Sequence, residues 1–386
     1  MDGVDYDIII CGGGPAGSTC AMTFKDTNAR VLVIDKTSFP REKVCGDGIA
    51  PYIPKILNRI SPSFKEAFEA FPAKSSITKI FLRSYNGTSV EVELNEHFYV
   101  STRYNFDTFL YEQANSLPNV DYANNTSIKD VKVYADYAEV QTDTRIYKAK
   151  LVIGCDGAMS AVRRALTDFK VKEEKKWATV RAYYSGVTGT DQERFEVYYS
   201  KKHPNGYFWL FPSEGGKVNI GFGTFSHLVS ERKLDVKKLM LDMVAEIPEL
   251  KARFAKASLE GDIKGWSIPV DFENSILSGD RFMLCGDAAS LPDPATGEGI
   301  GPAMSSGRIA GFFAQKCLEK ECFSDSFMKG YNQEIEKKFG SLIRKRKRVE
   351  KWFSKHNWML DSFVSVIGAS KFIRKRGEVL LGRLLS

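Results

Sequence analysis

The sequence predicts an α/β fold combined with a β fold: a Rossmann-like domain, a discontinuous antiparallel-sheet domain and a helical carboxy-terminal region. An apolar strand, a glycine-rich turn, a helix and a second strand follow one another over residues 6–35, as at the start of a Rossmann-like domain. Four short β-rich runs then occur between residues 178 and 224, and a helical stretch is expected around Val236 to Phe254. Another apolar strand begins at Arg281 and leads to a glycine-rich helix start, so we expect the chain to return there to the first domain.

The composition is that of an ordinary globular protein of 386 residues, with 43% apolar and 27% charged residues. No uninterrupted apolar run approaches the roughly 18 residues of a membrane-spanning helix, so we expect no transmembrane protein. The amino terminus lacks the basic and apolar segments of a secretory signal, and the seven cysteines are odd in number and mostly lie in apolar runs. We therefore expect a cytoplasmic protein with reduced thiols. With four histidines and no zinc-like cysteine spacing, we expect no metal site.

The first strand, turn and helix carry the spacing of a dinucleotide-binding motif. Its residues are Gly12, Gly14, Pro15, Ala16 and Gly17, and the second strand ends at Asp35 and Lys36. Glycines at this spacing allow a tight turn, a close approach of the backbone to a pyrophosphate, and close packing of the helix on the strand. Asp35 is placed to accept a hydrogen bond from a ribose 2′-hydroxyl group. Because the motif recognises the ADP half that FAD and NAD(P) share, it does not distinguish between them.

The strand that begins at Arg281 ends in Gly286 and Asp287, and a helix is expected to begin shortly after Gly297, Gly299 and Ile300. An aspartate at a strand end can accept a hydrogen bond from a ribityl or ribose hydroxyl group. A glycine-rich helix start can offer backbone N–H groups to the pyrimidine side of a flavin. This second segment therefore favours FAD, although an ordinary strand, turn and helix would also have this pattern.

These segments, together with Arg103 near Phe106 and Asp107, and with Asp156-Gly157 near Arg163, resemble the ordered FAD signatures of the para-hydroxybenzoate hydroxylase-like flavoproteins. The resemblance covers residues 5 to about 310. It implies a non-covalent, extended FAD whose isoalloxazine ring lies at the boundary between an FAD-binding domain and a β-sheet substrate domain. The residues expected to contact FAD are Gly12, Gly14, Pro15, Ala16, Gly17, Asp35, Lys36, Arg41, Cys45, Gly46, Arg103, Asp156, Gly157, Gly286, Asp287, Gly297, Gly299 and Ile300.

Two segments indicate a branch of this superfamily. Residues 43–46, Lys-Val-Cys-Gly, resemble the Lys-x-Cys-Gly segment of geranylgeranyl reductases, and residues 207–212 with 221–223 resemble their Tyr-x-Trp-x-Phe-Pro and Gly-x-Gly motif. We expect Arg41 and Lys43 to lower the pKa of the Cys45 thiol and favour the thiolate. Cys45 is the candidate catalytic residue, as a proton donor, a conformational gate or a group that shapes the pocket. Alternatively, its loop only binds FAD phosphates.

The candidate substrate-binding residues are aromatic. Tyr207, Trp209 and Phe211 alternate along one strand and would form an apolar wall, although a plain half-buried strand shows the same pattern. Trp266 precedes Ile268-Pro269, as in the Trp-x-Trp-x-Ile-Pro segment of flavin-dependent halogenases, but Lys264 replaces the first tryptophan.

The expected domain organisation is discontinuous. Residues 1–74, 101–165 and 275–325 form the FAD-binding domain, residues 75–100 and 166–274 the β-sheet substrate domain, and residues 326–386 the basic helical region. From Ser341 onward, twelve Lys and Arg residues face three acidic ones, and aromatic residues lie among them. Such a segment can rest on an anionic membrane surface or can simply be a solvated helical cap. Without a nucleic-acid-binding module we expect no nucleic-acid partner.

The leading hypothesis is an FAD-dependent oxidoreductase that reduces carbon–carbon double bonds of a prenyl (geranylgeranyl-type) or similar apolar substrate. Reduced flavin would deliver the hydride, and NAD(P)H is a possible transient electron donor. One alternative is an oxygen-using halogenase or monooxygenase. A further alternative is a flavoprotein that modifies or binds a protein partner through its basic tail. The sequence does not indicate an oligomeric state.

Overall fold

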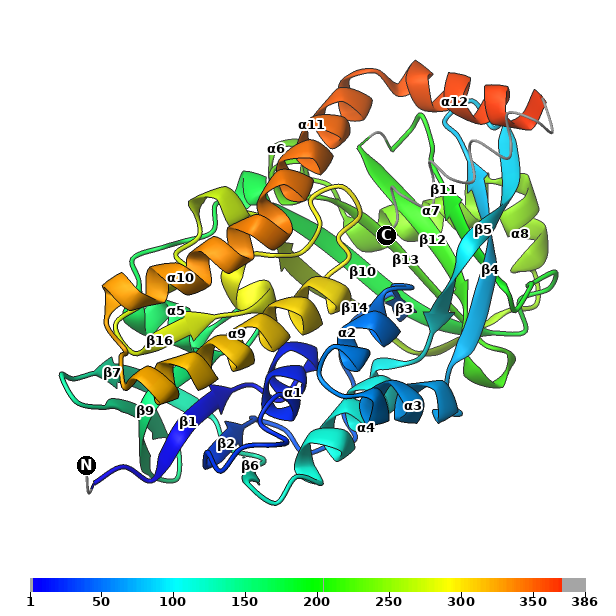
Figure 1. The fold of residues 1–386 in the computed structure, drawn as a ribbon. Helices are drawn as coiled ribbons and strands as arrows, with labels where there is room; N and C mark the ends of the chain where they lie inside the picture. Colours follow the sequence, from blue (N-terminus) through cyan, green and yellow to red (C-terminus); the bar gives the residue numbers. More distant parts are fainter. Residues whose placement is uncertain (1–2, 204, 370–386) are drawn as a thin grey trace.

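Two eight-stranded sheets organise the described part of the protein. The computed structural model describes residues 3–203 and 205–369 (Figure 1). The first sheet has the order β15-β16-β9-β1-β2-β6, and β8 and β7 continue it from the first half of β9. Its strands are β1 (Tyr6–Cys11), β2 (Val31–Ile34), β6 (Val120–Ala123), β7 (Ile128–Val133), β8 (Ala138–Thr142), β9 (Ile146–Gly154), β15 (Ser278–Gly279) and β16 (Phe282–Leu284).

The central strands of this first sheet are parallel and buried. Ile9 lies opposite Leu32 of β2 on one side and Val152 of β9 on the other, and all three side chains are inaccessible or nearly so. Continuous apolar strands of this kind are typical of parallel sheets that are covered on both faces. The carboxyl ends of β1, β9 and β16 therefore meet at one edge of the sheet, where ligands of α/β folds usually bind.

Two helices cover this sheet side by side, α1 (Pro15–Met22) and α9 (Ile300–Lys320) (Figure 1). They approach very closely because α9 carries glycine at the contact. A Cβ on Gly307 would lie 2.1 Å from the carbonyl oxygen of Ala16, and one on Gly311 would lie 2.1 Å from Thr23 Oγ1. The two glycine-rich segments that begin α1 and α9 are thereby held together. The other helices of this part are α2 (Ile53–Asn58), α3 (Pro62–Ala70), α4 (Arg103–Asn115) and α5 (Ala161–Leu166).

The second sheet has the order β14-β10-β13-β12-β11-β4-β5-β3. It is antiparallel except where β11 pairs with β4. Its strands are β3 (Gly48–Ile49), β4 (Ser75–Arg83), β5 (Ser89–Val100), β10 (Lys176–Ser185), β11 (Arg194–Tyr198), β12 (Gly206–Pro212), β13 (Val218–Phe225) and β14 (Ser258–Pro269). The expected antiparallel sheet is found, and the predicted fold class is confirmed. The domain boundaries stay a prediction.

The two faces of the second sheet have different partners. Alternate residues of β12, Phe208 and Leu210, share a core with Met240 of α7 (Val236–Glu246), while α8 (Pro248–Arg253) adds Leu250 to this core. The sequence suggests one helix here, but it is divided because Pro248 begins a new helix. The opposite face of β12 lies against the loop that carries Cys45, since a Cβ on Gly46 would lie 3.3 Å from Trp209 Nε1.

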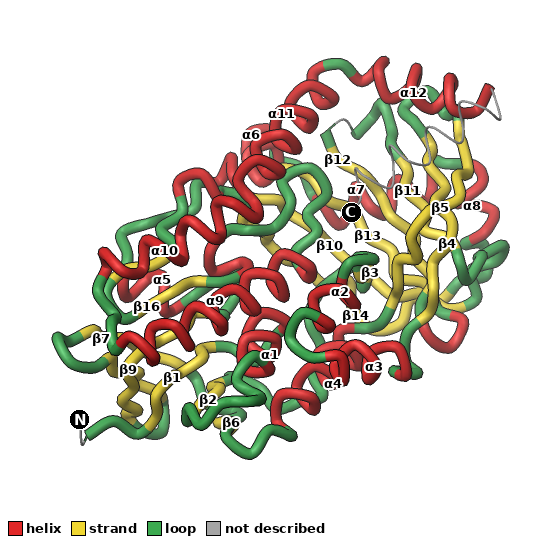
Figure 2. Tube along the Cα trace, viewed as in Figure 1, coloured by secondary structure: helices red, strands yellow, loops and turns green. Residues whose placement is uncertain are grey.

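The chain continues in helices after the first sheet is complete (Figure 2). These are α10 (Asp325–Ile335), a π-helical turn (Glu336–Gly340), α11 (Ser341–Lys355) and α12 (Asn357–Ala369). Val364 and Ile367 of α12 pack with Leu82 and Val90 of the β4–β5 hairpin. The aromatic and basic segment at residues 372–376 lies outside the described residues. No helix of the described chain combines the length and apolarity needed to cross a membrane.

Candidate active site

The turn after β1 can be built only with glycine at two positions. Gly12 has a positive φ of 102°, and a Cβ there would lie 2.4 Å from the carbonyl oxygen of Cys155. A Cβ on Gly17 would lie 1.8 Å from the carbonyl oxygen of Gly12. The backbone N–H of Gly13 donates to Asp35 Oδ2 at 2.8 Å, which fixes the turn against the end of β2. The close packing that the glycine motif predicts is therefore present.

Asp35 also holds the loop that follows β2, a role that the sequence did not indicate. Its Oδ1 accepts hydrogen bonds from the backbone N–H of Thr37 at 2.9 Å and from the Thr37 hydroxyl at 2.7 Å. The carboxylate thus joins the glycine turn to the loop after β2, and contact with a ribose hydroxyl stays a prediction. Lys36, next to it, is exposed to solvent. Gly14 caps α1 without a side chain, so the first turn of this helix is open to a phosphate group.

The Asp156 segment follows β9 and lies next to the turn at residues 286–287. Asp156 Oδ2 accepts from the backbone N–H groups of Ala161 at 2.6 Å and Val162 at 3.1 Å, whereas Oδ1 is buried and has no hydrogen-bond partner among the described residues. Arg163 donates to the carbonyl oxygens of Asp287 at 3.3 Å and Ala288 at 3.0 Å. The predicted sites at residues 156–157 and 286–287 are therefore neighbours. The unsatisfied oxygen of Asp156 is free for a polar group of a bound cofactor.

The turn after β16 lies between the beginnings of α1 and α9. A Cβ on Gly286 would lie 3.1 Å from the Cβ of Ala303 and 3.6 Å from that of Ala16. A Cβ on Gly299 would lie 3.5 Å from Asp287 Oδ1, so these two predicted residues are adjacent. Burial raises the pKa of Asp287, although nearby Lys43, Arg103 and Arg163 oppose the rise. Gly297, with a positive φ of 71°, and Ile300, the first residue of α9, complete this segment.

Two arginines of the predicted cofactor site share one buried carboxylate. Arg103 makes a two-pronged contact with Asp107, through Nε at 2.6 Å and Nη2 at 2.7 Å, and Arg41 Nη2 lies 3.0 Å from the same side chain. Burial disfavours the charge on Arg103, yet the Asp107 carboxylate holds its pKa above the usual value. A Cβ on Gly14 would lie 3.3 Å from Arg41 Nη2. This cluster therefore brings positive charge to the glycine turn and suits a pyrophosphate.

The expectation of a Cys45 thiolate is wrong. Burial raises the pKa of the thiol, and this effect exceeds the opposing effects of Arg103 and Lys43. The sequence analysis also expected Arg41 to lower the pKa of this thiol, but Arg41 forms an ion pair with Asp107 instead. The environment of Lys43 is similar: burial and Arg103 lower the pKa of its ammonium group to about 8, although Asp287 opposes this. Cys45 therefore carries its proton at neutral pH.

A buried polar network that the sequence analysis missed lies directly behind Cys45. Asn219 Nδ2 donates to the Cys45 carbonyl oxygen at 2.9 Å and to Asp47 Oδ2 at 2.8 Å, and its Oδ1 accepts from Trp209 Nε1 at 3.0 Å. The Tyr183 hydroxyl also donates to Asp47 Oδ2, at 2.5 Å. Asn219 lies between apolar residues of β13, and a polar residue in such a buried strand was the signal available in the sequence.

Strand β12 brings its three predicted aromatic residues to this loop and to the start of α9. The Tyr207 hydroxyl donates to the carbonyl oxygen of Thr296 at 2.5 Å. A Cβ on Gly46 would lie 3.3 Å from Trp209 Nε1, and the rings of Phe211 and Phe195 are 4.0 Å apart. The structure therefore places these aromatic residues beside both Cys45 and the FAD signature.

Trp266 of β14 lies on the same side of the sheet, next to the Cys45 loop. The Lys43 ammonium group is 3.4 Å from the centre of the Trp266 ring, and Trp266 Nε1 is buried with no hydrogen-bond partner in the part of the chain that the structure describes. Lys264, which replaces the first tryptophan of the halogenase segment, forms an ion pair with Glu42 at 2.7 Å. The segment is therefore closely associated with the loop at residues 42–45.

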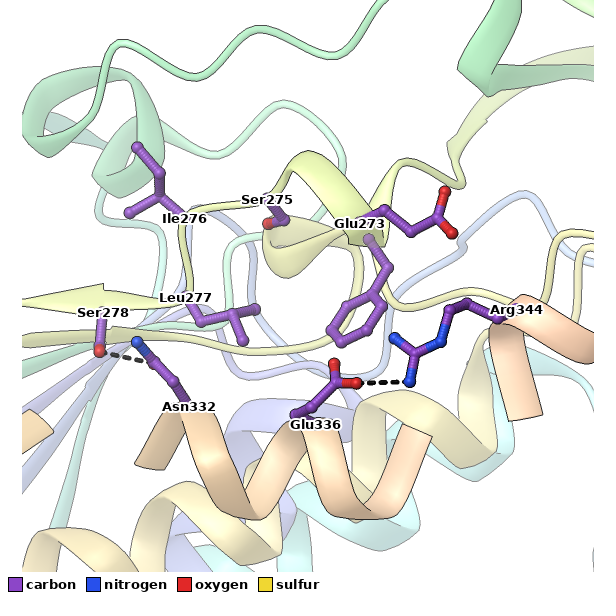
Figure 3. A pocket seen from close by; sticks show the side chains of 9 residues that line it. Glu273, Ser275, Ile276, Leu277, Ser278, Asn332, Glu336 and Arg344 are labelled. Atoms are coloured by element: carbon purple, nitrogen blue, oxygen red, sulfur yellow. Dashed lines mark hydrogen bonds and ion pairs between the residues drawn. The ribbon is translucent and has the colours of Figure 1, made fainter. Parts of the chain in front are cut away.

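Two pockets lie away from this arrangement or at its margin. One, of about 480 Å³, is formed by residues 272–278 together with Asn332, Glu336 and Arg344 (Figure 3). Ser278 donates to Asn332 at 2.7 Å there, and Glu336 pairs with Arg344 at 2.6 Å. It contains none of the predicted site residues. A second, of about 260 Å³, lies between α2, α9 and α11 and includes Glu298 of the α9 signature.

The glycine turn, the arginine cluster and the segments at Asp156 and Asp287 thus lie together at the carboxyl edge of the first sheet, whereas Lys36 is exposed to solvent. The Cys45 loop and the loop before α9 contact the aromatic side of the second sheet. The family model described as an FAD binding domain matches residues 5–311. The chain belongs to this FAD-binding domain family. The predicted family, the FAD cofactor and the class of FAD-dependent oxidoreductase are confirmed. The glycine turn, the arginine cluster and the unsatisfied Asp156 oxygen all fit this cofactor.

Relatives of this member of the FAD-binding domain family are also informative. A digeranylgeranylglycerophospholipid reductase of Methanopyrus kandleri is 26% identical over 380 residues, which cover 96% of this chain and 92% of the relative. A protein of the same name from Methanococcoides burtonii is 29% identical over 372 residues, with 92% and 86% covered. The solved structure of a geranylgeranyl bacteriochlorophyll reductase-like protein from Thermoplasma acidophilum matches with a TM-score of 0.83, 24% identity and coverage of 95% and 92%. The flavin-dependent brominase Bmp2 shares the fold, with a TM-score of 0.77, 19% identity and coverage of 98% and 93%.

Proposed function

We propose that this FAD-dependent oxidoreductase reduces carbon–carbon double bonds in the prenyl chain of a geranylgeranyl-type lipid. The observation that carries the proposal is the aromatic face of β12, which lies against both the Cys45 loop and the loop before α9. Such a face suits a long apolar chain better than a polar substrate. The names of the reductase relatives from methanogens support the same substrate class.

The proposed reaction needs a hydride, a proton and a dry site. Bound, reduced FAD supplies the hydride. Cys45 supplies the proton to the other alkene carbon, because burial keeps it in the thiol form. Tyr207, Trp209 and Phe211 hold the prenyl chain and exclude water, and Trp266 borders the same space. We also propose that the residues assigned to FAD above hold it, and that NAD(P)H reduces it transiently.

The test is to reduce the bound flavin without oxygen and to add geranylgeranyl lipids. Flavin reoxidation is expected before any air enters, together with a product whose mass has risen by two hydrogens for each reduced double bond. The fully saturated lipid is the control and should leave the flavin reduced. Reoxidation by air alone, with every prenyl lipid unchanged, would rule the proposal out.

A second candidate is oxygen-dependent halogenation. The observation in its favour is Lys43, a partly buried lysine of lowered pKa next to Trp266 in the halogenase-like segment. Under this proposal, air and bromide or chloride together would be required for product, and an aromatic acceptor would gain a halogen. Formation of a reduced prenyl product in the oxygen-free reaction described above contradicts it.

We further propose a peripheral contact with a membrane that contains the lipid substrate. Helices α11 and α12 expose large apolar residues: Leu342, Trp352, Trp358 and Val366. Basic residues lie among them on α11, including Arg344 and Lys345. Tryptophan at the interface and cations near anionic headgroups both favour binding to a bilayer surface.

A further inference from the structure

The loop before α9 folds around one side chain, that of Asp293. Asp293 Oδ1 accepts hydrogen bonds from the backbone N–H groups of Ala295 at 2.7 Å and Thr296 at 3.1 Å. The Asp293 carbonyl oxygen accepts from the N–H of Gly297 at 2.9 Å, and the Asp293 N–H donates to the carbonyl oxygen of Glu298 at 2.8 Å. Asp293 therefore sets the shape of the chain that leads into the glycine-rich start of α9.

Three parts of the molecule hold this loop. The second sheet contacts it through Trp177, whose Nε1 donates to the carbonyl oxygen of Pro294 at 3.2 Å, and through the Tyr207 hydroxyl described above. The residue that precedes α2, Tyr52, contacts it through a hydroxyl group that donates to Glu298 Oε2 at 3.2 Å. The third part is α11, which runs past the loop (Figure 1). The contact from α11 is an ion pair.

The ion pair engages the second oxygen of the same carboxylate. Arg346 Nη1 donates to Asp293 Oδ2, and both side chains are only 8% exposed. A buried carboxylate without a counter-charge is costly, so the guanidinium group allows Asp293 to keep its charge inside the protein. Oδ1 thus shapes the loop while Oδ2 is neutralised from α11. Arg346 follows the segment that matches the FAD-binding domain family, residues 5–311, yet it contacts that segment directly.

A cavity beside the ion pair makes this contact important for the position of the loop. The pocket of about 260 Å³ between α2, α9 and α11 is lined by Asp293, Glu298 and Arg346, and Ile343 of α11 lies on its wall. A cavity provides no packing atoms, so the loop is not held by close packing on this side. The charges also reach Glu298: burial raises its pKa to about 7, Asp293 adds to the rise and Arg346 opposes it. The position of the loop on this side therefore depends on the ion pair.

We propose that Arg346 is a positioning residue for FAD, which holds the loop before α9 in its FAD-binding shape through the ion pair with Asp293. This inference rests on the proposed function, in which Gly297, Gly299 and Ile300 contact FAD. Backbone N–H groups bind a ligand best when they are held in place before it arrives, and a loop that must first be ordered loses part of the binding free energy. Arg346 acts through Asp293 rather than by touching FAD.

The test measures how fast the FAD-loaded protein releases FAD after dilution, followed by the fluorescence of the freed flavin. Arg346→Met should speed release about tenfold, because the unpaired Asp293 carboxylate no longer keeps its place in the loop. Arg346→Lys should keep the rate close to that of the wild type, since the contact uses one nitrogen and lysine supplies one. An unchanged rate in Arg346→Met, or an equal acceleration in both variants, overturns the inference.

Arg253→Met is the control for a loss of stability that does not involve the loop. Arg253 pairs with Glu196 at 2.6 Å in the second sheet, and Glu196 is buried as Asp293 is. This variant also breaks a buried ion pair, yet it should release FAD at the wild-type rate. Equal acceleration in Arg253→Met and Arg346→Met would show a general loosening of the protein and overturn the inference.

Two double variants test the route through Asp293 and cover the case in which Arg346→Met does not fold. In Asp293→Asn/Arg346→Met the charge is gone, but the amide oxygen can still accept from Ala295 and Thr296, so FAD release should be close to the wild-type rate. Asp293→Ala/Arg346→Met lacks this acceptor as well, and it should release FAD about tenfold faster than the first double variant. Equal rates in the two double variants would overturn the inference.

These release measurements contain no lipid, so their outcome is independent of the substrate. The expected release rates together with unchanged prenyl lipids in the oxygen-free reaction would overturn the proposed substrate alone. Prenyl reduction together with equal release rates in the double variants would overturn the role of Arg346 alone.

Discussion

Cys45 shows that burial can determine the protonation state of a side chain even when cations lie close to it. Arg103 and Lys43 both favour its thiolate, yet burial raises the pKa of the thiol. A thiolate would suit a nucleophile, whereas a protonated thiol suits a donor to an alkene carbon. The residue therefore fits reduction better than covalent catalysis.

Replacing Cys45 by alanine tests this chemical role. The variant should bind FAD as the wild type does, because the loop is also held by Asn219 and by β3. Turnover on a geranylgeranyl lipid should fall by about a hundredfold or more, since a positioned proton donor contributes that much. Flavin absorbance after gel filtration gives the FAD content, and product mass gives the turnover. Unchanged turnover would refute the role of Cys45.

Glu298 should make the stability of the protein depend on pH. Its Oε1 accepts from the backbone N–H of Gly301 at 2.7 Å, its Oε2 accepts from the Tyr52 hydroxyl at 3.2 Å, and burial raises its pKa from 4.5 to about 7. The folded state then holds more protons than the unfolded state between these two pH values, so stability falls as pH rises through this window. In Glu298→Gln, the free energy of unfolding should fall by up to about 3 kcal/mol less over this pH window than in the wild type. Urea unfolding at pH 4.5 and 8 measures the free energy of unfolding of the wild type and of the variant. An equal fall between the two pH values in both proteins would contradict the role of Glu298.

For single residues, the sequence analysis found those that belong to short motifs. It did not find those whose importance comes from a contact with a distant residue. Gly12, Asp35 and Cys45 were predictable because each belongs to a short contiguous pattern. Asp47 and Asn219 were missed because their contact joins positions far apart in the chain. The thiolate prediction failed for a related reason, since neighbouring charges can be seen in a sequence and burial cannot.

The pair of helices α1 and α9 is the element on which the cofactor site depends most directly. Alanine normally stabilises a helix interior by about 1 kcal/mol relative to glycine. Gly307→Ala should do the opposite, because the new Cβ would lie 2.1 Å from the carbonyl oxygen of Ala16 and would push α1 away. We expect a lower melting temperature and weaker FAD binding. Gly368→Ala in α12 is the control, since no atom of the described residues lies within 4 Å of its Cβ, and it should be neutral or stabilising.

Helix α11 is fastened to the loop before α9 by a buried ion pair. Arg346 of α11 pairs with Asp293, and both side chains are almost fully buried. Arg346→Met would leave the Asp293 carboxylate buried and unpaired, at a cost of about 3–5 kcal/mol. Arg344→Met, which removes only a more exposed pair with Glu336, should cost less than about 1 kcal/mol. Denaturant unfolding compares the two variants, and similar losses would show that the Asp293 contact does not stabilise the helix.

The helices and strands and their order along the chain were largely predictable from the sequence. The break between α7 and α8 and the short strand β3 were not. The four expected strands between residues 178 and 224 are β10 to β13. The single helix expected from Val236 to Phe254 is broken at Pro248, whose ring favours the start of a helix over its interior. Strand β3, with two residues, is too short for any periodic pattern to indicate.

At the scale of the whole molecule, the exposed apolar residues of α11 and α12 predict a membrane-facing side. Trp358 is 64% exposed, and Trp358→Ser should weaken sedimentation with vesicles that contain anionic lipid by several-fold. Turnover on detergent-dispersed substrate should be unaffected. Ile146→Ser, 49% exposed on β9, is the control and should bind vesicles normally. Equal vesicle binding by both variants would contradict a contact through this side.

The strand order of the first sheet also has a consequence for biosynthesis. Strand β16 and helix α9 come late in the chain, yet they complete a site that β1 and α1 begin. A ribosome must therefore release every strand of the second sheet before the residues of the FAD site are all available. Until then the nascent chain exposes the apolar edge of β9 that β16 later covers. Chaperone demand during synthesis should accordingly be greatest just before residue 282 emerges, and the supply of free FAD should govern how much of the new protein survives.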